Sequence, residues 1–189
     1  MGNPFTLDCP DGQLLSGVSL FADPSGPING LRLVCRAVLS VGLGIDGLYG
    51  ELSAEQATDW LGVQTGLPFQ VGCQPGELAR TVTVVAADFG QGALQRIGLE
   101  CVTVFRNQAR SVPPVGLSAS NPVTVPLGCP IGRAPVGVSG HYGSHVSQTA
   151  VALPLSSPRL SGNGRAAPGA EPGAALHHRR VTGPLTSNR

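Results

Sequence analysis

The residues best suited to chemistry lie around the single tryptophan. Glu51, Glu55 and Asp59 are spaced four residues apart, and Asp59 directly precedes Trp60. In a helix this spacing would place the three carboxylates on one face. Carboxylates beside an aromatic ring can hold a sugar through hydrogen bonds and stacking. We therefore predict that Glu55, Asp59 and Trp60 contact carbohydrate. The alternative is a solvated helix face with the tryptophan in the interior.

Other kinds of catalytic motif are absent from the sequence. There is no G-x-S-x-G elbow for a nucleophilic serine. There is also no lysine, which a phosphate-binding G-x-x-x-x-G-K-[ST] loop requires. A glycan-cleaving enzyme needs two carboxylates, and Glu51, Glu55 and Asp59 are the candidates for that role. We predict no catalytic residue, and a glycan-acting enzyme is the less favoured alternative.

The histidines do not indicate a metal site. His141 and His145 are four residues apart, but Gly143 between them favours a turn over the helix that would bring both to one side. Cys129 could join them only through the fold, and the sequence has no C-x-x-C pair. We predict neither a bound metal nor a cofactor.

The five cysteines mark an internal repeat. Cys9, Cys73 and Cys129 each open a copy, with a glycine three residues later and alternating apolar residues upstream. Each copy has the pattern of a strand, a turn and a hairpin, and Cys35 and Cys101 close the first two hairpins. We predict the disulfides Cys9–Cys35 and Cys73–Cys101, each closing about 25 residues and stabilising the fold by roughly 3 kcal/mol. The third copy has no closing cysteine, so Cys129 is predicted to be a buried free thiol. The alternative is five reduced cysteines in a cytosolic core.

Composition favours an all-β fold. The chain has 27 glycines and 17 prolines in 189 residues, and only 12% of its residues are charged. Three strand-rich copies predict a three-fold β-prism of three four-stranded antiparallel sheets. The prism is expected over residues 1–157, with repeats at about 3–66, 67–122 and 123–157. Residues 158–189, with five arginines and one acid, are predicted to be a disordered basic tail. Between the first two copies, Ser53 and Gln56 have the spacing of a capping box and predict one helical turn over residues 53–60.

Two segments of the first copy carry a family resemblance. C-P-D-G-x-x-x-S-G-x-S-L at residues 9–20 and I-N-G-L-R-L-V-C at residues 28–35 resemble vitelline membrane outer layer protein I. The resemblance covers about residues 3–155 and implies a β-prism like that of the jacalin lectins. It also implies a secreted, non-enzymatic structural or glycan-contacting protein of an extracellular coat or matrix. The alternative is a jacalin-like lectin with a defined sugar site, for which Gly140, His141 and Tyr142 are the candidate residues.

Charge and hydropathy limit the kinds of partner that we expect for this protein. The net charge is +1 at pH 7, and basic and aromatic residues do not alternate, so we expect no nucleic acid partner. The most apolar stretch, residues 31–48, is interrupted by charges and glycines, so we expect no membrane span. The start, Met1-Gly2-Asn3-Pro4, does not have the pattern of a signal peptide. The paired cysteines nevertheless favour a secreted protein whose partner is an extracellular glycan or glycoprotein matrix.

Overall fold

The computed structural model describes residues 3–44, 47–87, 93–104, 108–118, 122–129, 133–142 and 146–152. Every regular element in these ranges is a strand. In chain order the strands are β1 (Asn3–Asp8), β2 (Gln13–Ala22), β3 (Ile28–Gly44), β4 (Gly47–Leu52), β5 (Gln56–Ala57), β6 (Leu61–Gly62), β7 (Leu67–Gly72), β8 (Glu77–Ala87), β9 (Leu94–Thr103), β10 (Ala109–Gly116), β11 (Pro122–Gly128), β12 (Gly137–Tyr142) and β13 (Val146–Ala152). The predicted all-β class is therefore confirmed. The predicted tail at 158–189 lies outside the described residues, and within them no helix could cross a membrane.

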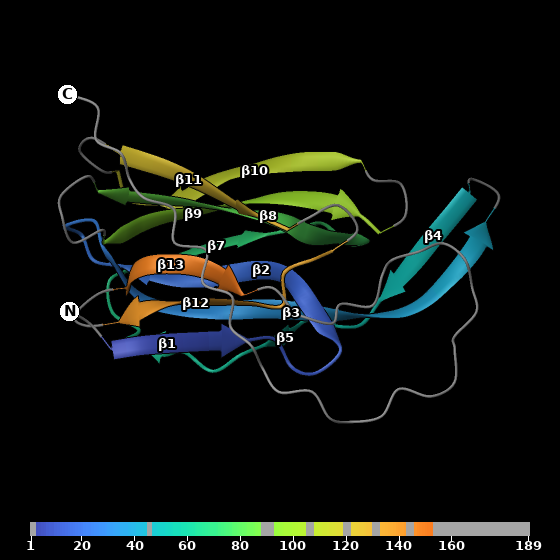
Figure 1. The fold of residues 1–189 in the computed structure, drawn as a ribbon, viewed down its shortest axis with the longest axis horizontal. Coiled ribbons are helices and arrows are strands. Elements are labelled where there is room, and N and C mark those ends of the chain that lie inside the picture. Colours follow the sequence, from blue (N-terminus) through green and yellow to red (C-terminus); the bar gives the residue numbers. More distant parts are fainter. Residues whose placement is uncertain are drawn as a thin grey trace.

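The described strands form three antiparallel sheets (Figure 1), and one of the three has the predicted four strands. The orders are β1-β12-β13, β10-β9-β8-β11 and β4-β3-β2-β7, and in the last sheet β5 and β6 also pair with β3. The extra strands arise because β3 is 17 residues long. Its backbone N–H and C=O groups along one edge form hydrogen bonds with β4, β5 and β6 at successive positions. In Figure 1, β3 and β4 extend beyond the other strands as a projecting hairpin.

Strands are exchanged cyclically between the three hairpins. The hairpin β2–β3 receives β7, the hairpin β8–β9 receives β11, and the hairpin β12–β13 receives β1. The strand upstream of each opening cysteine therefore joins the hairpin of another copy. The outer strands β7 and β11 therefore come from the residues directly upstream of Cys73 and Cys129. The first strand of the chain thus pairs with the last hairpin and closes the structure.

One hydrophobic core joins the three sheets. It combines leucines of β2 and β3 with Val82 and Leu99 of the second sheet and Val138 and Val146 of the third. Most of β2 is buried on both of its faces, but at its end Leu20 lies in the core while its neighbour Phe21 is only partly buried. Every sheet therefore contributes side chains to this common core.

The cysteines pair as predicted. Cys9 bonds to Cys35 and Cys73 bonds to Cys101, with sequence separations of 26 and 28 residues. Cys129 is a free thiol, which confirms that prediction, although it is half-buried rather than enclosed. Burial raises the pKa of the Cys129 thiol to about 11. The two disulfides anchor the first two hairpins at the same end of their strands.

Candidate functional site

The segment that carries the tryptophan is extended, and the helical turn predicted at residues 53–60 is wrong. Its backbone pairs along the edge of β3: the amide of Ser53 donates to the carbonyl of Ala37 at 2.9 Å, and the amide of Thr58 donates to that of Leu33 at 3.0 Å. The free edge of a long strand offers these partners to any neighbouring extended chain. Tertiary pairing therefore outweighed the local capping signal of Ser53 and Gln56.

A bulge in this segment determines where Trp60 points. The register runs from the pair Val34–Ala57 to the pair Leu31–Leu61, so three residues of the segment lie opposite two of β3. One extra residue in a paired strand bends the chain and redirects a side chain. The ring of Trp60 consequently lies against Phe21 and Arg32, whose strands place them on the outer face of the six-stranded sheet.

Trp60 forms one wall of a pocket of about 280 Å³ on this outer face. Its ring centroid is 5.0 Å from that of Phe21, with the planes tilted by 51°. The floor follows the sheet register, in which Ser19 is the partner of both Arg32 on β3 and Gln70 on β7. Cross-strand partners share a face, so these three polar residues form a row beneath the rings. The pocket lining consists of Ser19, Leu20, Phe21, Arg32, Trp60, Pro68, Phe69 and Gln70.

A glycine on β3 makes room for the bulged segment. A Cβ added to Gly30 would lie 2.5 Å from the carbonyl oxygen of Val63, which follows β6. The close approach of the two backbones therefore requires glycine at this position. Gly30 pairs with Gly62, whose φ of +83° also favours glycine. These two glycines hold the segment close to β3 directly beside Trp60.

Arg32 provides the charge of the pocket. Its guanidinium carbon lies 4.7 Å from the centroid of the Trp60 ring, within the range of a cation–π contact. Within the described ranges no carboxylate lies within 4.0 Å of its nitrogens, and its buried Nε has no hydrogen-bond partner there. The pocket therefore presents an oriented cation that no carboxylate of the described protein neutralises.

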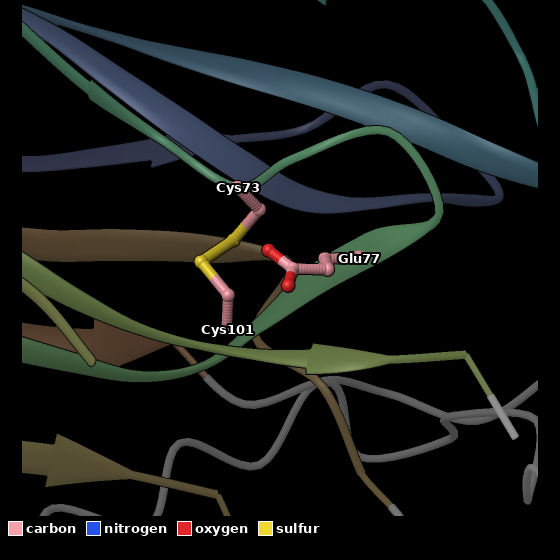
Figure 2. A group of neighbouring side chains, drawn as sticks. All are labelled: Cys73, Glu77 and Cys101. Carbon is pink, nitrogen blue, oxygen red and sulfur yellow. A yellow bond between two sulfur atoms is a disulfide. The ribbon is translucent and has the colours of Figure 1, made fainter. Parts of the chain in front are cut away.

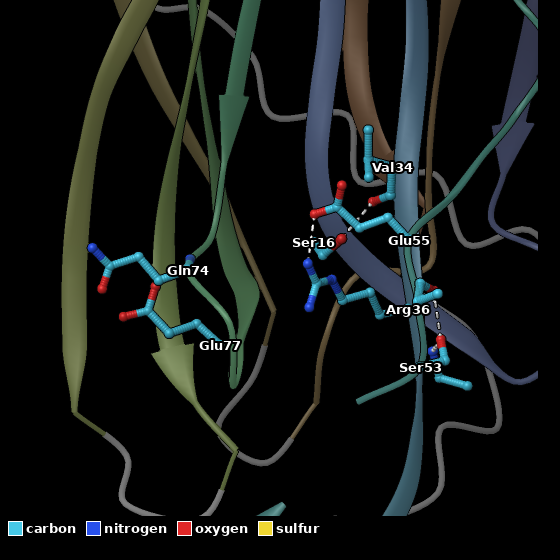
Figure 3. Close-up of polar contacts among 9 residues, drawn as sticks. Ser16, Val34, Arg36, Ser53, Glu55, Gln74 and Glu77 are labelled. Atoms are coloured by element: carbon cyan, nitrogen blue, oxygen red, sulfur yellow. Dashed lines mark hydrogen bonds and ion pairs between the residues drawn. The ribbon is translucent and has the colours of Figure 1, made fainter. Parts of the chain in front are cut away.

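Two of the predicted carboxylates, Glu51 and Glu55, have partners of their own. Glu55 accepts a hydrogen bond from Arg36 at 2.7 Å in an ion pair (Figure 3), and Glu51 accepts one from the hydroxyl of Ser40 at 3.2 Å. Asp59 is exposed beside Trp60 on the chain. The helix that would have placed all three on one face is replaced by extended segments. The helical arrangement on which the carboxylate cluster was based is therefore wrong, and the role of Glu55 and Asp59 in sugar binding stays a prediction.

The second candidate group lies on β12. Gly140, His141 and Tyr142 pair there with residues of β1. The hydroxyl of Tyr142 donates to the carbonyl oxygen of Asn29 at 3.4 Å, and its ring would meet a Cβ added to Gly62 at 2.7 Å. Tyr142 thus contacts the segment that carries Trp60, from a strand of another sheet. The role of Gly140, His141 and Tyr142 in sugar binding stays a prediction.

A cluster of possible metal ligands lies at the second disulfide (Figure 2). The ligand atoms of Cys73, Glu77 and Cys101 lie within 4.8 Å of one another. Both sulfurs are joined in the disulfide and offer no thiolate, which is the form that binds a metal. Glu77 accepts hydrogen bonds from Arg110 at 2.6 Å and from the amide of Gln74 at 2.9 Å. These donors occupy the carboxylate, so the cluster is a structural support of the turn.

Sequence reasoning identified Trp60 but missed the residues that complete its pocket. Phe21 and Arg32 are partly exposed between buried neighbours on their strands, which is the pattern of an outer face, whereas Ser19 is buried like the residues beside it. Gln70 and Pro68 come from a strand of the next copy. The alternation could have placed Phe21 and Arg32 on an outer face. It could not have shown that Trp60 lies over them, because that depends on the bulge.

Three antiparallel sheets around one core are the architecture of the jacalin-like β-prism lectins, and comparison with solved structures supports this fold. One similar structure is a prostate-specific WGA16 glycoprotein lectin, with a TM-score of 0.51 and 15% identity over 80% of this chain and 89% of that chain. Another is a single-chain recombinant jacalin, with a TM-score of 0.51 and 14% identity over 82% of this chain and 88% of that chain. No family model and no curated protein matches the chain. The likeness establishes a jacalin-like β-prism and does not single out the vitelline membrane outer layer protein I family.

Proposed function

We propose that this protein is a non-catalytic carbohydrate-binding protein of the β-prism lectin type, and that the pocket of Trp60 holds the sugar. The observation that carries the proposal is the bulge that places an indole ring over a row of polar side chains. Apolar walls with a few placed polar groups are typical of small-ligand sites. The C–H face of a sugar ring would lie against Trp60 and Phe21, and its hydroxyl groups would bond to Ser19 and Gln70.

The size of the pocket favours a short ligand. Its volume of about 280 Å³ lies near the lower limit of ligand pockets, which is about 300 Å³. We therefore infer that it holds one sugar residue at the end of a chain. The two disulfides favour an oxidising, extracellular environment. The partners would then be glycans of an extracellular coat, a matrix or a glycoprotein.

A glycan array tests this function. The natural protein, produced with both disulfides formed, is expected to bind a defined set of glycans. The Trp60→Ala variant should bind the same set at least tenfold more weakly, because the wall of the pocket is lost. Tenfold corresponds to about 1.4 kcal/mol of binding free energy.

The control is Leu39→Ala, which removes an apolar side chain that is 60% exposed on β3 and does not line the pocket. It should bind as the natural protein does. Absence of binding to any glycan would contradict the proposed function. Equal binding by Trp60→Ala and the natural protein would contradict the proposed site.

A further inference from the structure

We propose that the Trp60 pocket selects saccharides that carry an anionic group, a carboxylate or a sulfate, and that Arg32 is the residue that selects them. This inference rests on the proposed carbohydrate-binding function and names its substrate class. Arg32 is the one charged residue among the side chains that line the pocket of the described protein. No acidic side chain belongs to that lining, so a negative ligand would meet no repulsion from it.

The partners of the other arginines set Arg32 apart. Arg36, Arg80 and Arg110 each form an ion pair with a glutamate at 2.6–2.7 Å. Arg96 donates to the carbonyl oxygen of Pro114 at 2.8 Å. Most of the described guanidinium groups therefore already bond to a glutamate or a carbonyl oxygen of the protein itself. The buried Nε of Arg96 also lacks an acceptor, so this atom alone does not distinguish Arg32. Arg32 differs because its guanidinium lies against an aromatic ring and, within the described ranges, forms no ion pair.

This arrangement suits an anionic ligand. A buried donor without a partner is costly, and a ligand that supplies the acceptor recovers that cost on binding. Guanidinium groups bind carboxylates and oxyanions of sulfur or phosphorus through two parallel hydrogen bonds, and these are stronger than bonds between neutral groups. The cation–π contact with Trp60 restrains the plane of the guanidinium group. Less rotational freedom is then lost when the anion binds.

The row beneath the rings provides further hydrogen-bond donors. Ser19 is the register partner of Arg32, and Gln70 is the register partner of Ser19. A hydroxyl and an amide can donate to the remaining anion oxygens or to neighbouring sugar hydroxyls. The same sugar ring can therefore stack on Trp60 while its anionic substituent contacts Arg32. A neutral sugar would make the stacking contact but would offer the guanidinium of Arg32 only neutral hydroxyl acceptors, which bind it more weakly than an anion does.

Matched pairs of sugars test the selectivity. Isothermal titration of the full chain would compare methyl glucoside with methyl glucuronide, and methyl galactoside with its 6-sulfate. We expect at least one anionic member to bind tenfold or more tightly than its neutral partner, with the preference weakening as salt is added. Preference in the first pair only would assign a carboxylate, and preference in the second pair only would assign a sulfate. Preference in both would assign a general anion site.

Variants of Arg32 separate this inference from the proposed function. Arg32→Gln should reduce the affinity for the anionic member of each pair to that for its neutral partner. Arg32→Lys, which keeps the charge and loses the planar group, should retain part of the preference. Arg133→Gln removes an exposed arginine outside the pocket and should leave the preference unchanged. Equal affinity for both members of each pair would overturn the inference and leave the proposed function standing. Binding of no sugar at all would overturn both.

Discussion

At the scale of the residue, the ion pair between Glu77 and Arg110 supports the turn that follows Cys73. Glu77 is buried at 7% exposure, and its hydrogen bond with Arg110 holds the pKa of that carboxyl below its usual value. A depressed pKa in the folded state stabilises the protein above the unfolded value, which is 4.5. That stabilisation is lost as the pH falls through the folded value.

We therefore expect Glu77→Gln to lower the free energy of unfolding by about 1–3 kcal/mol at pH 7. The difference from the natural protein should shrink below about pH 4.5, where the natural carboxylate is progressively protonated. Urea unfolding between pH 7 and pH 3 measures both effects, with Glu51→Gln as an exposed control. A difference that stays constant across this range would show that ionisation of Glu77 contributes nothing.

The free thiol gives a second test at this scale. The pKa of Cys129 is raised to about 11 by burial, so little thiolate exists near pH 8. Iodoacetamide should modify Cys129 slowly in the folded protein and rapidly after unfolding in urea. Intact mass against time of reaction provides the measurement. Rapid modification of the folded protein would mean that the thiol is exposed and ionises normally.

At the scale of the element, the bulge between β5 and β6 depends on Gly30. A methyl group there would meet the carbonyl oxygen of Val63 at 2.5 Å, a contact that backbone atoms can relieve only by moving. Gly30→Ala should cost about 1–3 kcal/mol of stability and weaken glycan binding by displacing the Trp60 segment. Gly72→Ala is the matched control, because its added Cβ would meet an ordinary contact at 3.8 Å from Ser16. Thermal unfolding and sugar titration of both variants measure the two effects, and equal behaviour of the two would argue against the role of Gly30.

Most of the strands could be predicted from the sequence, but only part of the candidate site could. Alternating apolar residues and the paired cysteines indicated the hairpins β2–β3 and β8–β9, because both signals are local. The helix predicted over residues 53–60 was wrong, because hydrogen bonds to the edge of β3 hold this segment extended despite the helix-like spacing of Ser53 and Gln56. Arg32 precedes Trp60 by 28 residues in the sequence, and Ser19 precedes it by 41. Only the register of the sheet and the bulge bring them together.

At the scale of the whole molecule, the cyclic exchange of strands makes every hairpin depend on another copy. The sequence repeat predicted three sheets but not their unequal strand numbers, because those depend on how much of each linker pairs with a long strand. The hairpin β8–β9 also receives β11 and contributes Val82 and Leu99 to the common core. We therefore expect that loosening one hairpin lowers the stability of the whole prism.

Removal of the second disulfide tests this dependence. We expect Cys73→Ala with Cys101→Ala to lower the free energy of unfolding by about 3 kcal/mol, since the bond closes 28 residues. Unfolding should remain a single transition when followed by far-ultraviolet circular dichroism and by the fluorescence of Trp60, which belongs to a different sheet. Two separate transitions would mean that the sheets unfold independently.

The most direct test of the account is a fluorescence titration, because Trp60 is the only tryptophan of the chain. The protein would be titrated with the sugar that binds best on the array, and the emission of Trp60 would be followed alongside the heat of binding. The account predicts a saturable change in emission with the same dissociation constant that calorimetry gives. Binding detected by calorimetry with unchanged Trp60 emission, and with undiminished affinity in Trp60→Ala, would contradict it.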